Sequence, residues 1–329
     1  MKVLGQETAP LGMGCWPIGG KMYAGDQSVG YTRSNDAESI RTIHAALEGG
    51  ITLFDTAAAY GAGHAERMLA KGLKGRADAL VATKIGIAID EETKQLTGDE
   101  VEPESVLPAI DRCLARLERD RIDILLLHQN GLAVEQAEPV FNEMEKAISA
   151  GKVRAYGWST DFSQSVSAMA GRDNFIAVEH AMNVLVDTPK IQAVANDNDL
   201  IALIRSPLAM GLLSGKYGPE HTFGSEDIRS TSNPKTAYFL DAKANPEFLG
   251  KMDAVRDLLT SDGRTLVQGA LAWLWAKRAT NVPIPGARTV EQIEGLVGAL
   301  AHGALSQSTV QEIELMFDRS QDDVEERPL

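Results

Sequence analysis

Short apolar runs alternate with longer amphipathic segments along most of this chain. Eight of the runs have the length of a buried strand and are apolar at nearly every position, which is typical of parallel strands covered on both faces. The runs cover residues 11–16, 51–55, 79–84, 122–128, 153–159, 175–179, 200–206 and 282–285. The pattern therefore predicts repeated strand–helix units and a parallel sheet.

Amphipathic segments between the runs predict helices. Residues 36–48 form one of them, with Ser34 or Asn35 as its N-terminal cap. Residues 104–118 form a second, in which apolar side chains spaced by three or four positions share one face. These are Val106, Ile110, Leu114 and Leu117.

Eight such alternations favour a closed barrel. The intervals are mostly the few tens of residues that one strand–helix unit needs, and no linker rich in Pro, Gly and Ser divides the chain. We therefore expect an α/β fold consisting of a single (β/α)8 TIM barrel, with one domain over residues 1–329.

Residues 217–245 depart from this rhythm. They are rich in Gly, Ser, Thr, Asn, Pro and charge, and they follow the seventh predicted strand, on the side where barrel enzymes build their sites. We expect a long loop that serves as a lid; a surface excursion without a role is the alternative. Helices are predicted after it at 247–259 and 266–278, where Trp273 and Trp275 would be packing residues, and C-terminal helices at 296–305 and 310–317.

Charge and cysteine content limit the partners. The formal net charge of -14 opposes nonspecific binding to nucleic acid or to an anionic membrane. Cys15 and Cys113 are the two cysteines, and they show neither a metal-binding spacing nor a disulfide framework. No apolar stretch is long enough to cross a bilayer, and we expect a cytoplasmic location with reduced thiols. The histidines outside the predicted strands show no metal-binding spacing either, so no metal is expected.

Polar residues at or just beyond the ends of three successive predicted strands carry the candidate chemistry. They are Asp55, Tyr60, Lys84 and His128. Because the carboxyl ends of parallel strands gather around one cavity, we expect these side chains to be neighbours. Each of them alone has an ordinary structural explanation, and it is the combination that is specific.

A phenol beside an ammonium can donate a proton to a carbonyl oxygen. The ammonium of Lys84 is expected to lower the pKa of Tyr60 from about 10, and Asp55 is expected to be the counter-ion of Lys84. His128 would orient the carbonyl or relay a proton. The segment Gly61-Ala62-Gly63 is not a dinucleotide fingerprint, because Glu66 stands where its third glycine belongs.

With these residues the chain resembles the aldo-keto reductases over nearly its whole length. The landmarks are Leu11-Gly12-Met13-Gly14, Phe54-Asp55-Thr56-Ala57, Tyr60-Gly61, Thr83-Lys84, Leu126-Leu127-His128, Gly151-Lys152-Val153-Arg154 with Gly157, Ser206-Pro207-Leu208, Gly215-Lys216-Tyr217 and Ile284-Pro285-Gly286. The resemblance implies a (β/α)8 barrel and NAD(P)H-dependent reduction of an aldehyde or ketone to the alcohol. It also implies that Asp55, Tyr60, Lys84 and His128 form the catalytic tetrad.

The resemblance places the nicotinamide beside four residues, three of which depart from the family pattern. Ser159 matches, whereas Thr160 replaces the usual Asn and Glu179 the usual Gln. Arg205 stands where an aromatic ring is common, and its guanidinium can stack on a ring. As a hypothesis, the charge of Arg205 would disfavour the oxidised, cationic nicotinamide and so favour reduction.

The rest of the cofactor would lie along two further segments. The resemblance places Ser206, Leu208, Gly211, Ser214 and Lys216 beside the pyrophosphate. It places Gly286, Arg288, Thr289 and Gln292 near the adenosine phosphate, where a guanidinium suits a 2′-phosphate, while Gly295 and Leu296 replace the usual adenine contacts. NADPH is the expected cofactor and NADH the alternative.

The substrate is left open between small aldehydes, sugar-derived carbonyls and aryl ketones. Candidate pocket residues are Trp16, Met22 and Tyr23 after the first strand and Trp158 near the fifth. Two other functions remain in view: a Schiff-base aldolase or lyase that uses Lys84, and a cofactor-binding regulatory barrel with little turnover. The sequence determines neither the reaction direction in the cell nor the oligomeric state.

Overall fold

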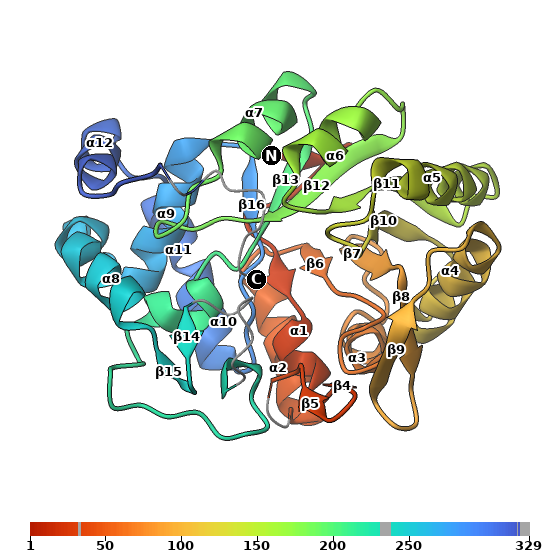
Figure 1. Cartoon of the computed structure of the whole chain (residues 1–329), viewed down its shortest axis with the longest axis horizontal. Coiled ribbons are helices and arrows are strands. Elements are labelled where there is room, and N and C mark those ends of the chain that lie inside the picture. The colour runs from red at the N-terminus through yellow and green to blue at the C-terminus, as the bar shows by residue number, and fades with distance from the viewer. Residues whose placement is uncertain (32–33, 231–237, 321, 323–329) are drawn as a thin grey trace.

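The computed structural model describes residues 1–31, 34–230, 238–320 and 322, and its centre is a closed barrel of eight parallel strands (Figure 1). Seven neighbouring pairs are parallel, and a parallel bridge between Gly14 and Gly286 joins the first strand to the last. Around the barrel the strands are β3 (Met13–Gly14), β6 (Leu53–Asp55), β7 (Leu80–Ile85), β10 (Ile122–Leu127), β11 (Val153–Ser159), β12 (Phe175–Ala181), β13 (Ile201–Arg205) and β16 (Asn281–Pro283). Each of the eight predicted runs overlaps one of them, so the expected barrel is confirmed.

Helices surround the sheet and separate its strands in the sequence. They are α2 (Asp36–Glu48), α3 (His64–Gly72), α4 (Pro103–Leu117), α5 (Val134–Ser149), α6 (Ser163–Met169), α7 (Pro189–Asp197), α9 (Leu266–Lys277) and α10 (Val290–Val297). The helix predicted at 36–48 has those bounds, and the side chain of Asn35 caps it by accepting from the Glu38 amide at 3.0 Å. On α4 the predicted apolar face is buried at Val106, Ile110 and Leu117, whereas Leu114 is half-exposed.

Further helices cover the core near the C-terminus. They are α8 (Pro246–Leu259), α11 (Ala299–His302) and α12 (Gln307–Leu315). The predicted packing roles of Trp273 and Trp275 are confirmed, because both rings are buried and both indole N–H groups are paired. Trp273 donates to Glu314 at 3.2 Å, and Trp275 donates to the carbonyl oxygen of Pro10 at 2.7 Å.

Alternate strand residues fill the barrel interior. Inner side chains such as Leu53, Ala82, Leu126 and Ala177 form one apolar cluster, and the residues between them face the helices. Gly157 is needed in this wall, because a Cβ there would lie 2.0 Å from the carbonyl oxygen of Ala177. The next inward-facing residue of each strand, two positions beyond this cluster, therefore lies at the carboxyl end of the barrel.

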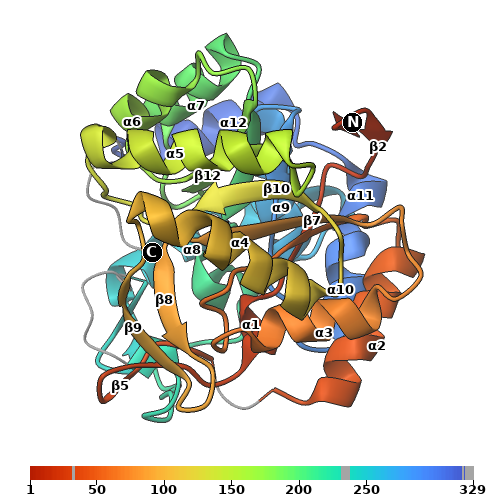
Figure 2. The same ribbon diagram turned by 90° about the vertical axis from the view of Figure 1, so that its right-hand side faces the viewer.

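The two ends of the barrel are closed differently (Figure 2). At the amino end, the hairpin β1 (Lys2–Val3) and β2 (Gln6–Glu7) places Val3 in the inner cluster. Arg154, at the start of β11, donates to the carbonyl oxygen of Leu4 at 2.9 Å. At the carboxyl end lies a small sheet of β4 (Tyr23–Ala24), β5 (Gln27–Ser28), β8 (Ile87–Asp90) and β9 (Gln95–Asp99), which the sequence did not predict.

The expected long loop has a core of its own. Its described part begins after the 3-10 helix η1 (Ala209–Ser214) and contains η2 (Ile228–Ser230) and the hairpin β14 (Phe239–Leu240) and β15 (Lys243–Ala244); residues 231–237 of the predicted segment lie outside the described residues. Arg229 pairs with Asp227 through two hydrogen bonds of 2.8 Å and lies 4.1 Å from the Phe223 ring centroid. The Ile228 amide donates to Gly30 at 2.9 Å, which joins the loop to the first β–α connection.

Two expectations concern the chain as a whole. In the described part of the chain, no helix is both long enough and apolar enough to cross a membrane. The assignment of one domain to residues 1–329 stays a prediction.

Candidate active site

A buried cluster of charged side chains lies at the carboxyl end of the barrel interior. Asp55 stands two residues beyond Leu53, Lys84 two beyond Ala82 and Glu179 two beyond Ala177, so the pleat turns all three side chains into the barrel. Lys84 Nζ donates to both carboxylate oxygens of Asp55 at 2.7 Å. The two side chains are almost fully buried, and a buried charge needs such a partner.

Lys84 has more partners than it has protons. Its Nζ lies 3.0 Å from the Thr56 carbonyl oxygen, 3.2 Å from the Tyr60 hydroxyl and 3.1 Å from Glu179 Oε2. An ammonium has three N–H groups, and the four acceptor oxygens of Asp55, Thr56 and Tyr60 already share them. Glu179 Oε2 is consequently in charge contact with Lys84 but has no hydrogen-bond partner.

Tyr60 is held by a tight turn after β6. Gly61 has a φ of 62°, and a Cβ there would lie 1.9 Å from the carbonyl oxygen of Gly19, so the turn requires glycine. Trp16 stacks on the Tyr60 ring with centroids 5.8 Å apart, and His128 meets the ring edge-on, also at 5.8 Å. All four residues of the predicted tetrad are thus brought together at one end of the barrel.

The protonation of the cluster differs in one respect from the sequence expectation. Burial raises the pKa of Tyr60 above 10, and the nearby Lys84 lowers it by less, so the expected net depression is wrong for this state of the chain. Burial works against a charged Lys84, but Asp55 and Glu179 outweigh it and raise its pKa. Burial, followed by the charges of Lys84 and Arg205, lowers the pKa of His128. The site therefore holds a phenol, an ammonium and a neutral imidazole.

The nicotinamide candidates lie at the ends of β11, β12 and β13. The Ser159 hydroxyl lies 3.4 Å from Glu179 Oε1, whereas the Thr160 hydroxyl donates to the Asn130 carbonyl oxygen at 2.6 Å, away from the tetrad. Arg205 donates to the carboxylate of Asp161, which is buried. The positive charge of Arg205 is therefore compensated, which removes the basis for its predicted effect on the oxidised nicotinamide.

The pyrophosphate candidates form a strained turn after β13. Ser206, Ala209, Met210 and Gly211 all have positive φ angles, and non-glycine residues adopt them rarely. Ser214 donates to the Gly211 carbonyl oxygen at 2.6 Å. The remaining candidates are Leu208, which is half-buried, and Lys216, which is exposed.

The adenosine-phosphate candidates lie at the start of α10. The Gln292 side chain accepts from the Arg288 amide at 2.8 Å, the Thr289 side chain caps the helix, and Gly286 is exposed. Glu38 of α2 accepts from the Val290 amide at 3.1 Å. The helix N-terminus thus already holds an anionic group, as its dipole favours.

The family assignment follows from comparison with known proteins. A profile of the aldo/keto reductase family matches residues 10–316. The chain belongs to the aldo/keto reductase family. It is 30% identical over 303 residues to aldo-keto reductase YhdN of Bacillus subtilis, covering 89% of this chain and 85% of that protein. It is 28% identical over 329 residues to aldo-keto reductase yakc [NADP(+)] of Schizosaccharomyces pombe, covering 97% and 91%.

Solved structures share the fold of this aldo/keto reductase. The glycerol dehydrogenase AKR11B4 of Gluconobacter oxydans superposes with a TM-score of 0.79 at 26% identity, covering 96% of this chain and 94% of that one. An aldo-keto reductase of Klebsiella pneumoniae in complex with NADPH gives a TM-score of 0.69 at 18% identity, covering 97% and 94%. The latter likeness concerns the fold alone.

The substrate-pocket candidates of this aldo/keto reductase lie in different surroundings. Trp16 stacks on Tyr60 and therefore lies at the site. Trp158 is fully buried, packs on Phe141 of α5 and donates to the Gln129 carbonyl oxygen at 2.9 Å. Since Ser159 next to it faces the interior, the pleat turns Trp158 toward the helices. Tyr23 lies half-buried on β4 in the small sheet.

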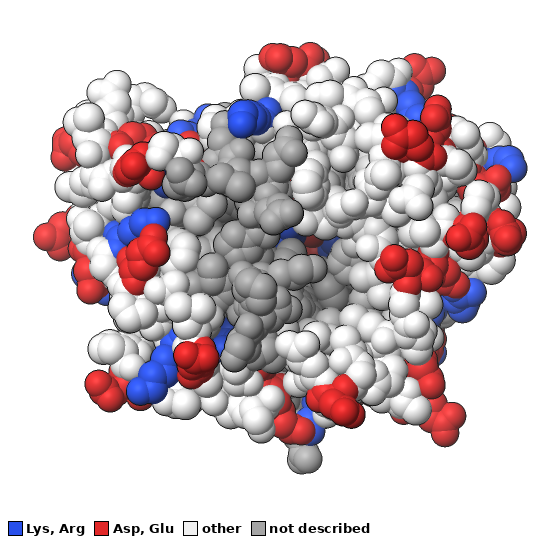
Figure 3. Space-filling model, in the orientation of Figure 1, with Lys and Arg blue, Asp and Glu red and all other residues white. Residues whose placement is uncertain are grey.

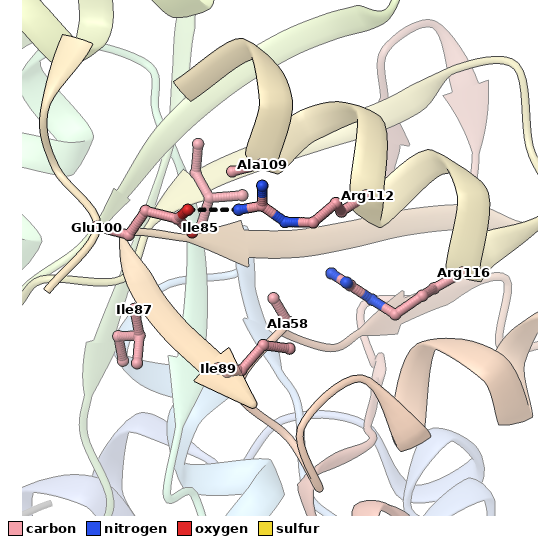
Figure 4. Close-up of a pocket in the computed structure, with 8 residues that line it drawn as sticks. All are labelled: Ala58, Ile85, Ile87, Ile89, Glu100, Ala109, Arg112 and Arg116. Atoms are coloured by element: carbon pink, nitrogen blue, oxygen red, sulfur yellow. Dashed lines mark hydrogen bonds and ion pairs between the residues drawn. The ribbon is translucent and has the colours of Figure 1, made fainter. Parts of the chain in front are cut away.

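The face that carries the small sheet is hollowed near its centre, and charged atoms are visible on the floor of the hollow (Figure 3). A separate small pocket lies outside the barrel wall, between β8 and α4 (Figure 4). Glu100 and Arg112 form an ion pair across it, and Arg116, beside it, is bound to the buried Glu66. None of the tetrad lines this pocket, so it is distinct from the site.

Sequence reasoning missed Asp161, Glu38 and Arg229. Asp161 lies just beyond β11 and Arg205 ends β13, so both stand at the carboxyl end of the barrel. This shared position could have suggested the ion pair. The contact of Glu38 with α10 and the aromatic surroundings of Arg229 join segments that are distant in sequence, which no local pattern reveals.

Proposed function

We propose that this aldo/keto reductase interconverts a small carbonyl compound and its alcohol with NADP(H), and that Tyr60 is the proton donor. The observation that carries the proposal is the distance of 3.2 Å between the Tyr60 hydroxyl and Lys84 Nζ, which Asp55 holds from behind. A cation at that distance stabilises the charge that appears on the phenol as its proton leaves.

The residues at the mouth suit a nicotinamide cofactor. Glu179 Oε2 and His128 Nδ1 are buried polar atoms with no hydrogen-bond partner. Such atoms are costly unless a ligand or water pairs them, so they fit a polar group bound above the cluster. Ser159 and Glu179 would hold the carboxamide, and the turn from Ser206 to Lys216 would hold the pyrophosphate. When bound, the cofactor supplies the hydride.

Tyr60 then acts on the substrate oxygen. The raised pKa keeps the phenol protonated at neutral pH, as a proton donor requires. Neutral His128, at the edge of the Tyr60 ring, can donate or accept a hydrogen bond at the same oxygen. Trp16 covers the Tyr60 ring from one side and limits access of water.

The test is the variant Tyr60→Phe, assayed with NADPH and a panel of aldehydes, sugars and aryl ketones. We expect turnover to fall by at least about a hundredfold while cofactor binding is retained. The matched control is Tyr156→Phe, which removes a hydroxyl bound to Glu145 outside the barrel. Unchanged turnover in Tyr60→Phe would exclude this residue as the acid.

The Schiff-base alternative is disfavoured by the surroundings of Lys84. A nucleophilic amine must lose its proton, but Asp55 and Glu179 stabilise the ammonium and raise its pKa. A covalent adduct at Lys84, trapped by borohydride with a carbonyl substrate, would revive that alternative. A regulatory barrel with little turnover predicts cofactor binding but no activity on the panel.

The choice between NADPH and NADH depends on the start of α10. NADPH is proposed because Arg288 is well shaped for a 2′-phosphate, and relatives such as yakc carry NADP(+) in their name. Glu38 opposes it, because its carboxylate occupies the Val290 amide and would repel a phosphate. We expect Arg288→Ala to weaken NADPH binding at least about tenfold and NADH binding little. Glu38→Gln should strengthen NADPH binding. A wild type that prefers NADH would contradict the proposal that Arg288 binds the 2′-phosphate of NADPH.

A further inference from the structure

The second carboxylate beside Lys84 is the feature on which this inference rests. Glu179 is 1% exposed, its Oε2 lies 3.1 Å from Lys84 Nζ, and that oxygen has no hydrogen-bond partner. One ammonium therefore faces two carboxylates, Asp55 and Glu179. Two like charges in a buried site raise each other's cost of ionisation, and burial followed by Glu179 raises the pKa of Asp55.

The other charged groups around Glu179 do not cancel this excess. Arg205 is the cation on β13, and Asp161 compensates it. His128, just beyond the end of β10, has a lowered pKa and stays neutral, and Tyr60 is protonated. Ser159 on β11 is a neutral neighbour at 3.4 Å. At a pH where both carboxylates are ionised, the end of the barrel thus carries more negative than positive charge.

We propose that Glu179 makes this site selective for the oxidised, cationic form of the nicotinamide. The inference rests on the proposed function, which places the nicotinamide beside Ser159 and Glu179. Oε2, which has no hydrogen-bond partner, can accept a hydrogen bond from the carboxamide NH2, and the excess negative charge attracts a cationic ring but not the neutral reduced ring. The effect is opposite to the one that an uncompensated Arg205 would have.

The consequence concerns the direction of the reaction, and it differs between the chemical step and the release of the cofactor. A site that binds the oxidised cofactor more tightly than the reduced one shifts the equilibrium between the bound forms toward alcohol. The reduced form leaves more easily after an alcohol has been oxidised, whereas the oxidised form is retained after a carbonyl has been reduced. Glu179 therefore opposes the chemical step of alcohol oxidation on the enzyme but eases the release of the reduced cofactor that follows it.

The test is the ratio of two dissociation constants, Kd for NADP+ over Kd for NADPH, measured by calorimetry at mildly alkaline pH. Glu179→Gln keeps the size of the side chain and removes its charge. We expect this variant to raise the ratio at least about tenfold. The control, Glu312→Gln, makes the same change at an exposed position on α12 and should leave the ratio as in wild type.

A wild-type measurement serves if Glu179→Gln does not fold. Acidification from about pH 8 to about pH 5 should raise the same ratio, because protonation of Asp55, whose pKa is raised by burial and by Glu179, removes the excess charge. The 2′-phosphate also titrates in this range, but it is common to both cofactor forms and cancels in the ratio.

The outcomes separate this inference from the proposed function. A ratio in Glu179→Gln within about twofold of wild type, with both forms bound, would reject the role of Glu179 alone. If Glu179→Gln does not fold, a wild-type ratio of the two dissociation constants that does not change with pH would reject the role of Glu179 instead. A wild type that binds neither form would reject the proposed function and this inference together.

Discussion

Both carboxylate oxygens of Asp55 accept hydrogen bonds from Lys84 Nζ at 2.7 Å, although the two residues lie 29 positions apart in the chain. The pair joins β6 to β7 at the carboxyl end of the barrel, and both partners are buried. A buried pair contributes little when intact, but the loss of one partner strands the other. The site and the stability of the barrel are therefore linked through Lys84.

Lys84→Met should be strongly destabilised at neutral pH. It leaves the carboxylates of Asp55 and Glu179 without their cation, and we expect the free energy of unfolding to fall by about 3 to 5 kcal/mol. Acidification should recover part of this loss, because both groups can then be protonated. Denaturant unfolding at neutral and acid pH measures both effects. Lys251→Met, which removes an exposed ion pair on α8, is the control; equal stability of the two variants at neutral pH would contradict the prediction.

His128 should make stability depend on pH in a defined direction. Its pKa in the folded chain lies below the ordinary value of 6.5, so below that value the unfolded chain binds a proton that the folded chain does not. The contribution of neutral His128 to the free energy of unfolding is complete above about pH 6.5. It is lost as the pH falls, at up to about 1.4 kcal/mol per pH unit. Unfolding curves of wild type and His128→Asn between about pH 7 and about pH 5 should converge on acidification. Parallel pH dependence would show that His128 is protonated in the folded chain.

Gly157→Ala should disturb the wall that carries Glu179. Its Cβ would lie 2.0 Å from the carbonyl oxygen of Ala177, two residues before Glu179, so β11 and β12 would have to separate. We expect a loss of at least about 2 kcal/mol in the free energy of unfolding. Gly171→Ala is the matched control, since its Cβ would meet no atom within 4 Å. Two variants of equal stability would mean that the sheet yields without cost.

Arg229 should hold the long loop in place. Arg229→Met leaves Asp227 buried without its cation and removes the charge that faces Phe223 and Tyr217. We expect chymotrypsin to cleave at these two aromatic residues at least about tenfold faster than in wild type. Lys243→Met, an exposed change on β15 in the same loop, should not alter the rate. A loop equally resistant in both variants would show that Arg229 is dispensable.

Much of the barrel was predictable because its strands are apolar on both faces and end in characteristic polar residues. The small sheet at the mouth was not, since β8 and β9 are short and half-exposed, and β4 meets β9 through the single pair Tyr23–Gln95. Because Tyr23 and Gln95 are far apart in the sequence, their pairing leaves no local hydrophobic pattern.

The site was predictable to the extent that strand ends determine it. The position of Lys84 beside Asp55 follows from adjacent strands, whereas the position of Trp158 could have been deduced from strand alternation and was missed. The lowered pKa expected for Tyr60 failed for another reason: the sequence reveals the neighbouring cation but not how completely the phenol is buried. Burial and charge compensation arise from the assembled barrel.

The N-terminal hairpin has a practical consequence. The N-terminus lies on the opposite side of the barrel from β8 and β9 (Figure 2), and the Met1 ammonium donates to the Thr8 carbonyl oxygen at 3.0 Å. A tether fused ahead of Met1 would thus hold the protein on a bead or an electrode by that end of the barrel, and the end that carries the candidate active site would face the solution.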